Sequence, residues 1–271
     1  MNRESVEFSA HFNRTFAAIA TSEVYHDAVR SSMPDLPDWV VPFSVTNLAD
    51  LTLIARELHL DHGHCFVDLA CGLGGPGIWV AEQSNAKLVG VDFSRAAIEA
   101  ALELALARGL EDRARFVVAD ASDTGLPAAI FAGVMSVDSV QFLDPHSVMR
   151  EIARLLRPGG VSVIRTWEAL VEDLPLPTMV HDYRPVLGSV GLVVRKYVEV
   201  GGIREREHAF HCALQVRGDA LSAEIGPIAA NILDEARDSL AREDVNPRVR
   251  KIWIVAEKSG ERVAVENSPK K

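Results

Sequence analysis

The central part of the chain alternates short apolar runs with segments of helical periodicity. Each apolar run has the length of a buried strand and is bounded by glycine, proline or acidic residues. The predicted strands are residues 65–69, 87–91, 115–119, 130–137 and 161–164. The helices predicted between them are residues 78–83, 95–108 and 146–156. This alternation indicates an α/β fold, in which parallel strands are joined by helices that cover both faces of one sheet.

Less regular segments flank this alternation. Residues 1–45 have aromatic residues at helical spacing, interrupted by prolines, and residues 46–60 form a clearer amphipathic helix. Residues 203–240 are again helical, with a predicted break at Gly226-Pro227. A last apolar run at residues 251–256 predicts one more strand.

The composition restricts the class of protein. The chain has 271 residues, 48 % hydrophobic and 24 % charged, so it can bury the core of a large α/β domain. A formal net charge of −10 opposes binding to nucleic acid. Three cysteines without a Cys-x-x-Cys pair argue against disulfides and a zinc site, so we expect no metal. With no signal-peptide core and no apolar run near ~20 residues, we expect a cytoplasmic protein without a membrane partner.

A glycine-rich loop follows the first predicted strand. It runs Asp68-Leu69-Ala70-Cys71-Gly72-Leu73-Gly74-Gly75-Pro76-Gly77, and Asp92 lies twenty residues after Gly72. Glycines let the backbone approach a ligand, and an acid at the end of the second strand can accept hydrogen bonds from ribose hydroxyls. Taken alone, this loop is typical of a nicotinamide dinucleotide site and of other nucleotide-cofactor sites alike.

Neighbouring features favour a different cofactor. Asp68 stands at the start of the loop, where a carboxylate would repel a pyrophosphate but attract an ammonium or sulfonium group. Asp120 ends the third strand, in a position to read an adenine amino group, and Arg157-Pro158-Gly159-Gly160 precedes the fifth. None of the three tyrosines has a lysine four residues later, as a short-chain dehydrogenase requires.

With these motifs in order, the sequence resembles the class I S-adenosylmethionine-dependent methyltransferases, in the branch that modifies natural products, sterols and quinones. The motifs are Val67 to Gly75, Gly90 to Ser94, Ala119 to Ala121, Val134 to Val137 and Arg157 to Gly160. The resemblance covers about residues 45–200, and residues 251–256 fit the family's antiparallel seventh strand. The chain departs from the family at Ala70 and Ala132, where glycine and aspartate are usual.

The resemblance implies a Rossmann-like, mostly parallel sheet of seven strands. Its last strand is antiparallel, helices cover both faces, and a helical cap or lid is added. The organisation we expect is an N-terminal helical lid at 1–45, an S-adenosylmethionine-binding core at 46–200, a helical cap over the acceptor site at 201–250, and a final strand and tail at 251–271.

The resemblance also implies the residues that contact the cofactor, S-adenosylmethionine. Those expected at its methionine part are Asp68, Ala70, Gly72 and Gly74. Asp92 would hold the ribose hydroxyls, and Phe93 would lie against the adenine. Those expected at the adenine edge are Asp120 and Ala121, with a backbone contact from Val137.

Methyl transfer from a sulfonium is an in-line displacement, which requires alignment and needs a base only for some acceptors. The candidate bases are Asp138, His146 and His181. Many relatives carry a histidine near position 141, where this chain has Gln141, which leaves room for a mechanism based on proximity. The candidate acceptor contacts are Trp39, Phe43 and Trp167, whose rings fit ordinary packing equally well.

We therefore expect a methyltransferase of secondary metabolism that acts on a small-molecule acceptor by O- or C-methylation. The sequence is compatible with a homodimer. The alternative is an enzyme of the same fold that uses the cofactor for a non-methylating isomerisation or pericyclic step. A cofactor-binding regulatory subunit comes third, and a nicotinamide-dependent dehydrogenase is disfavoured most.

Overall fold

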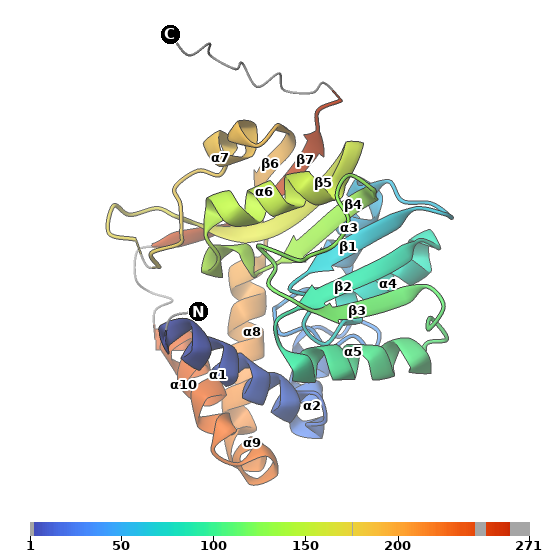
Figure 1. Ribbon diagram of the computed structural model, residues 1–271. Helices are drawn as coiled ribbons and strands as arrows, with labels where there is room; N and C mark the ends of the chain where they lie inside the picture. Colours follow the sequence, from blue (N-terminus) through green and yellow to red (C-terminus); the bar gives the residue numbers. More distant parts are fainter. Residues whose placement is uncertain (1–2, 175, 242–247, 261–271) are drawn as a thin grey trace.

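One seven-stranded sheet organises the chain (Figure 1). The computed structural model describes residues 3–174, 176–241 and 248–260. The strands are β1 (Cys65–Leu69), β2 (Lys87–Asp92), β3 (Ala114–Val118), β4 (Phe131–Val137), β5 (Leu156–Ala169), β6 (Leu192–Glu199) and β7 (Val249–Lys258). They lie in the order β3-β2-β1-β4-β5-β7-β6, where β1 to β5 pair in parallel and β7 is antiparallel to β5 and β6. The predicted sheet is confirmed, including its antiparallel last strand.

Successive side chains of each strand point to opposite faces of the sheet, and helices cover both faces, so the side chains on both faces are buried. Phe66 and Met135 join the hydrophobic core on one face, while Val67 and Val134 join the core on the other. The helices that pack on the first face are α3 (Leu48–Leu58), α4 (Gly75–Ser84) and α5 (Arg95–Ala107). Those on the second face are α6 (Pro145–Leu155) and α7 (Arg184–Ser189). The near-continuous apolar strands in the sequence follow from this double burial.

The start of β5 differs from the sequence prediction. The strand begins at Leu156, which pairs with Phe131, and the register shifts before Gly133 pairs with Val161. A Cβ at Gly160 would lie 2.9 and 3.0 Å from the carbonyl oxygens of Arg157 and Phe131. The Pro-Gly-Gly segment therefore forms an irregular beginning of the strand, which periodicity alone does not reveal.

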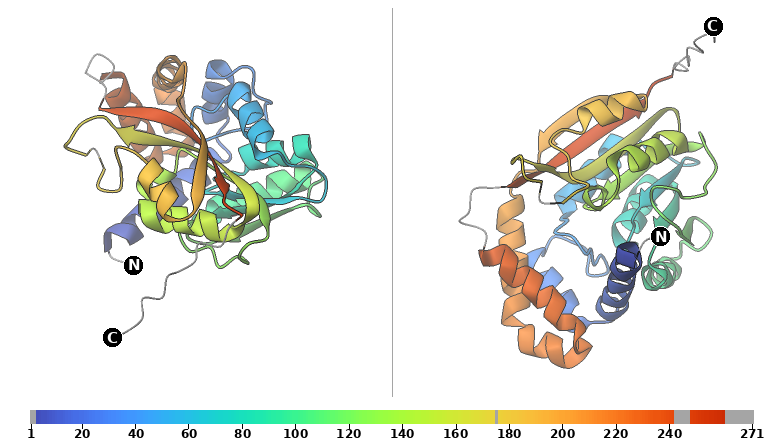
Figure 2. Two further views of the ribbon diagram at one scale, coloured as in Figure 1. Left: turned by 90° about the horizontal axis from the view of Figure 1, so that it is seen from above. Right: turned by 60° about the vertical axis from the view of Figure 1, so that its left-hand side comes forward.

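Two helical segments from opposite ends of the sequence gather at one end of the sheet (Figures 1 and 2). They comprise α1 (Arg3–Ile19), α2 (Glu23–Ser32), α8 (Ile203–Val216), α9 (Gly218–Ile225) and α10 (Ile228–Ala241). Tyr25 of α2 packs edge-on against Phe210 of α8, with ring centroids 5.8 Å apart. The Glu224 carboxylate of α9 accepts hydrogen bonds from the backbone amides of Glu23 and Val24, at 2.9 and 3.3 Å. The segments expected to form a lid and a cap thus pack as one helical group.

No helix in the described part of the chain is long and apolar enough to cross a membrane.

The predicted break at Gly226-Pro227 separates α9 from α10, and a further break at Arg217 separates α8 from α9.

The N-terminal helix is fastened to the sheet domain by one polar side chain. The Asn13 Oδ1 of α1 accepts hydrogen bonds from Ser94 Oγ (3.0 Å) and from the Ala96 amide (3.1 Å). Ser94 itself caps α5, since its Oγ accepts from the Ala97 amide. Because the first amides of a helix lack intrahelical acceptors, Asn13 completes the cap of α5 from another element.

Replacing Asn13 by alanine should lower the free energy of unfolding by about 1–2 kcal/mol, because two hydrogen bonds to the start of α5 are lost. Urea denaturation measures this change. The control is Asn231→Ala on the exposed surface of α10, for which we expect no loss. Equal stability of the Asn13 variant and the wild type would contradict the role of Asn13 as a cap.

Candidate functional site

The central crevice of the sheet lies at the carboxyl ends of β1 and β4. Strand order reverses direction there, because β2 and β3 continue the sheet on one side of β1, while β4 and β5 continue it on the other. In open α/β sheets, ligands bind at such a switch point. The glycine-rich loop leaves β1 at this place and enters α4 at Gly75.

The loop turns through residues in the left-handed region. Ala70, Gly72 and Gly74 have φ of 57°, 52° and 80°. A Cβ at Gly74 would lie 2.7 Å from the Cβ of Ala101 in α5, so the loop approaches that helix too closely for a side chain. Ala70 adopts the conformation that glycine supplies in the family, at a cost of about 1–2 kcal/mol. The departure at Ala70 therefore preserves the path of the loop.

Asp92 holds the loop from the end of β2. Its Oδ2 accepts a hydrogen bond from the Gly72 amide at 2.9 Å, and its Oδ1 accepts one from the Ser94 amide at 2.9 Å. The carboxyl group is buried, and burial raises its pKa despite these two bonds. Each oxygen keeps a lone pair for a further donor, as binding of a ribose diol would need.

Asp68 is the second buried carboxyl group beside the loop. It lies at the end of β1, and the Gly77 amide at the start of α4 donates a hydrogen bond to it. Burial, and then the nearby charge of Asp92, raise its pKa to about 8. Among the described residues neither acid has an ion pair, so the site holds two buried acids without a cation. A ligand that carries an ammonium and a sulfonium group fits this imbalance.

Phe12 of α1 is the centre of an aromatic cluster that includes Phe93, which follows β2. The Phe12 ring of α1 lies 6.1 Å from Phe93, 5.9 Å from Phe43 and 6.4 Å from Phe142 between centroids. Phe16 extends this cluster to the loop, because its ring would be 3.3 Å from a Cβ at Gly72. The predicted residues Phe43 and Phe93 are thus brought together by α1, which closes over the loop.

The remaining predicted contacts are more dispersed. Asp120 is exposed after β3, and its Oδ1 accepts from the Ser122 amide at 2.7 Å, while Ala121 is buried. Val137 is the last residue of β4, at the crevice. Trp39 lies under the guanidinium of Arg108 and lines a cavity of about 200 Å³ together with Leu73 of the loop. These roles stay predictions.

Asp138, the first candidate base, is engaged by two cations. Its carboxylate accepts from Arg165 Nε (3.0 Å) and Nη2 (2.9 Å) and from Lys251 Nζ (3.0 Å). Burial would raise its pKa, but the charges of Arg165 and Lys251 hold it below the ordinary value. Such a carboxylate accepts a proton poorly at neutral pH. Trp167, a candidate acceptor contact, lies beneath the Lys251 ammonium at 4.8 Å.

The other polar candidates are placed differently. His146 is exposed at the start of α6, and His181 is exposed with its Nδ1 3.1 Å from the carbonyl oxygen of Ala169. Gln141 is buried, donates from Nε2 to the Asp138 carbonyl (2.8 Å) and accepts at Oε1 from Thr166 Oγ1 (3.1 Å). Its side chain therefore braces the turn after β4.

The sequence does not single out three residues of this region: Asn13, Phe12 and Arg165. Arg165 carries the most visible signal, since it directly follows the apolar run 161–164, and a charge at the end of such a run calls for a buried partner. Asn13 and Phe12 lie in a helix whose partner no local pattern specifies.

Comparison with known proteins agrees with this site. Residues 66–160 match the family described as "Methyltransferase domain". The chain is 31 % identical over 160 residues to methyltransferase GfsG of Streptomyces halstedii, which covers 59 % of this chain and 56 % of that protein. It is 34 % identical over 118 residues to the 27-O-demethylrifamycin SV methyltransferase of Amycolatopsis mediterranei, which covers 43 % of each. The chain thus spans about half the length of these curated relatives.

Solved structures share the fold. The match to the [4+2]-cyclase SpnF has a TM-score of 0.69 and 22 % sequence identity. It covers 78 % of this chain and 80 % of the SpnF chain. The match to the cyclopropane synthase MmaA2 from Mycobacterium tuberculosis has a TM-score of 0.71 and 14 % sequence identity. It covers 92 % of this chain and 98 % of the MmaA2 chain. At these identities the likeness concerns the fold alone. Residues 66–160 are thus similar to a methyltransferase domain, and the curated relatives that match this part of the chain are methyltransferases.

Proposed function

We propose that this protein transfers a methyl group from S-adenosylmethionine to a small-molecule acceptor, by O- or C-methylation of a secondary metabolite. The observation that carries this proposal is the pair of buried acids, Asp68 and Asp92, beside the glycine-rich loop. Among the described residues neither carboxyl group has an ion-pair partner, so a cationic ligand would stabilise their ionised forms, whereas a pyrophosphate would destabilise them. The names of the relatives, which methylate a rifamycin and other small molecules, support the acceptor class.

Different residues would contact different parts of the bound cofactor. Asp92 would receive the ribose hydroxyls, Phe93 would lie against the adenine, and Asp68 would face the positive charges of the methionine part. The bound cofactor supplies an electrophilic methyl group on a sulfonium. Phe12 and Phe43 form an apolar wall near Phe93, which would exclude water and hold a greasy acceptor.

Alignment is the main catalytic contribution that these residues offer. Asp138 is neutralised by two cations, and Gln141 is held by hydrogen bonds at both ends of its amide. An acceptor held in line with the methyl group gains the advantage of proximity without a base. A cytoplasmic location, a homodimeric state and the absence of a nucleic-acid substrate stay predictions, the last supported by the net charge of −10.

Incubation with methyl-labelled S-adenosylmethionine and a panel of phenolic, polyketide and terpenoid acceptors should transfer label to at least one class, as mass spectrometry would show. The wild type without acceptor is the control. A product isomeric with its substrate and free of label, formed while the cofactor binds, would instead establish the pericyclic or isomerising alternative.

Asp92→Asn should weaken binding of S-adenosylhomocysteine about 10- to 150-fold, because a charged acceptor for the ribose hydroxyls contributes ~1.5–3 kcal/mol. Isothermal titration calorimetry measures this change. Asp112→Asn, at an exposed position in the turn before β3, is the matched control and should bind like the wild type. Unchanged affinity of the Asp92 variant would mean that the ribose lies elsewhere.

Binding of S-adenosylmethionine should release a proton from Asp68. The free carboxyl group has a pKa of about 8 and is mostly protonated at pH 7, whereas cations of the ligand stabilise the ionised form and lower that pKa. Affinity should therefore rise by up to about tenfold per pH unit between pH 6 and 8 and level off above. Calorimetry in buffers of different ionisation enthalpy detects the proton, and Asp68→Asn should abolish its release. A pH-independent affinity of the wild type would refute this linkage.

A further inference from the structure

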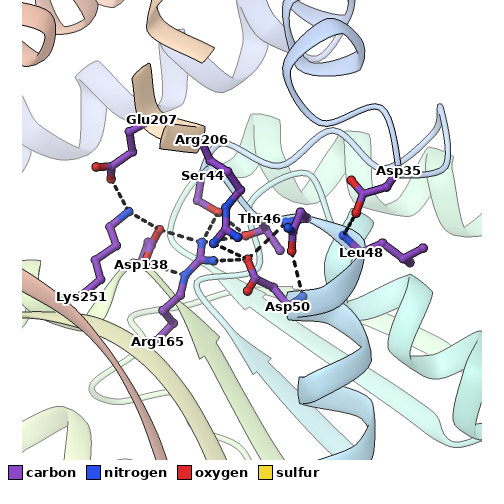
Figure 3. Close-up of polar contacts among 11 residues, drawn as sticks. Asp35, Ser44, Thr46, Leu48, Asp50, Asp138, Arg165, Arg206, Glu207 and Lys251 are labelled. Atoms are coloured by element: carbon purple, nitrogen blue, oxygen red, sulfur yellow. Dashed lines mark hydrogen bonds and ion pairs between the residues drawn. The ribbon is translucent and has the colours of Figure 1, made fainter. Parts of the chain in front are cut away.

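Six charged side chains form a closed ring between the sheet and the helical group (Figure 3). Along the ring they are Arg206, Asp50, Arg165, Asp138, Lys251 and Glu207. The successive N···O distances are 3.2, 2.7, 2.9, 3.0 and 2.8 Å. Arg206 and Glu207 are neighbours in α8, so the backbone of this helix closes the ring. We call these six residues the ion-pair ring.

Arg165 is the centre of the ion-pair ring. Its side chain is fully buried, donates two hydrogen bonds to Asp138 and one to Asp50, and reaches Thr46 Oγ1 at 2.8 Å and Ser44 Oγ at 3.3 Å through Nη2. Asp138 directly follows β4, Asp50 lies in α3, and Ser44 and Thr46 lie in the segment before α3. One guanidinium therefore fixes three separate parts of the sheet domain relative to one another.

The charges of the ion-pair ring balance. Three acids alternate with three bases, and the side chains range from 0 to 27 % exposed. Buried charges are tolerated only when paired, and loss of one partner leaves the other uncompensated at a cost of several kcal/mol. The ring thus penalises any displacement of α8 from the sheet, because Arg206 and Glu207 would separate from Asp50 and Lys251 together.

The ion-pair ring also reaches the switch point. Asp138 directly follows β4 and has a left-handed φ of 54°, and its amide donates to the Arg165 carbonyl at 2.8 Å. Its own carbonyl accepts from Gln141 Nε2, which sets the turn that carries Phe142 against Phe12. A continuous set of contacts thus links α8 to Phe12, which with Phe43 forms the proposed acceptor wall.

We propose that the ion-pair ring holds the helical group in register with the acceptor side of the crevice, and that Asp138 and Arg165 are positioning residues rather than bases. The acceptor side is the wall that Phe12 and Phe43 form in the proposed function, on which this part of the inference rests. The ring contacts neither Asp68 nor Asp92 through any ion pair recorded among the described residues, so its effect should fall on the acceptor and spare the cofactor.

Helix α8 provides a matched pair of variants to test this proposal. It begins Ile203-Arg204-Glu205-Arg206-Glu207, where Arg204 and Glu205 are exposed and the next two residues belong to the ring. The test variant is Arg206→Gln with Glu207→Gln, and the control is Arg204→Gln with Glu205→Gln. Both make the same chemical change in the same helix, two positions apart.

Hydrogen exchange of the intact protein measures the local effect. We expect exchange in α8 and α10 to accelerate at least tenfold in the ring variant, with β1 and β4 and the affinity for S-adenosylhomocysteine unchanged. The control variant should match the wild type. Arg206→Lys with Glu207→Asp keeps the charges and should restore slow exchange. With an acceptor from the panel, the KM for that acceptor should rise at least tenfold in the ring variant, while the KM for S-adenosylmethionine stays the same.

Equal exchange in the two glutamine variants would overturn the proposal. So would acceleration across the whole sheet with loss of cofactor affinity, since that pattern would mean general destabilisation. If the wild type neither binds S-adenosylhomocysteine nor methylates any acceptor, the proposed function fails, but the comparison of hydrogen exchange still decides the role of the ring in holding α8.

Discussion

Buried charge at the carboxyl edge of the sheet is the constraint on which this structure depends. On one side of the switch point, Asp68 and Asp92 are buried with no ion pair in the described part of the chain, and burial raises the pKa of both. On the other side, Asp138 is buried with two cations that lower its pKa. Aspartates at the ends of neighbouring strands thus have pKa values shifted in opposite directions. A buried carboxyl group without an ion-pair partner suits a cationic ligand, whereas the charge of Asp138 is already compensated by cations of the protein.

This contrast explains which functional predictions the sequence supports. The acids of the loop region follow apolar strands directly, and topology places the ends of parallel strands at one edge, so Asp68 and Asp92 are predicted together. Asp138 follows the same logic and has the same position relative to its strand. What separates it is its partners, Arg165 and Lys251, and Lys251 lies 113 residues away in the chain. No local pattern in the sequence indicates that pairing.

The helices show the same limit. Hydrophobic spacing predicts that α1 and the segment of α8 to α10 are helical, and it indicates that each has an apolar face to bury. It does not say against which element that face packs. Here Glu224 of α9 caps the start of α2 and Asn13 of α1 caps α5. Polar side chains of one helix thus complete the ends of another, and these contacts give the helical group its fixed arrangement.

Backbone strain marks the same edge of the sheet. Ala70 and Asp138 directly follow β1 and β4, the two strands that flank the switch point, and both are non-glycine residues with left-handed φ, at 57° and 54°. Each such residue costs about 1–2 kcal/mol and persists only where its surroundings determine it. For Asp138 the surroundings are the ion pairs of the ring, which aim the carboxylate back into the protein. For Ala70 they are the bonds that Asp92 and the Val91 carbonyl make to the Gly72 and Cys71 amides. Contacts with Asp92 and Val91 on one side, and with Arg165 and Lys251 on the other, therefore fix the two turns at the carboxyl ends of β1 and β4.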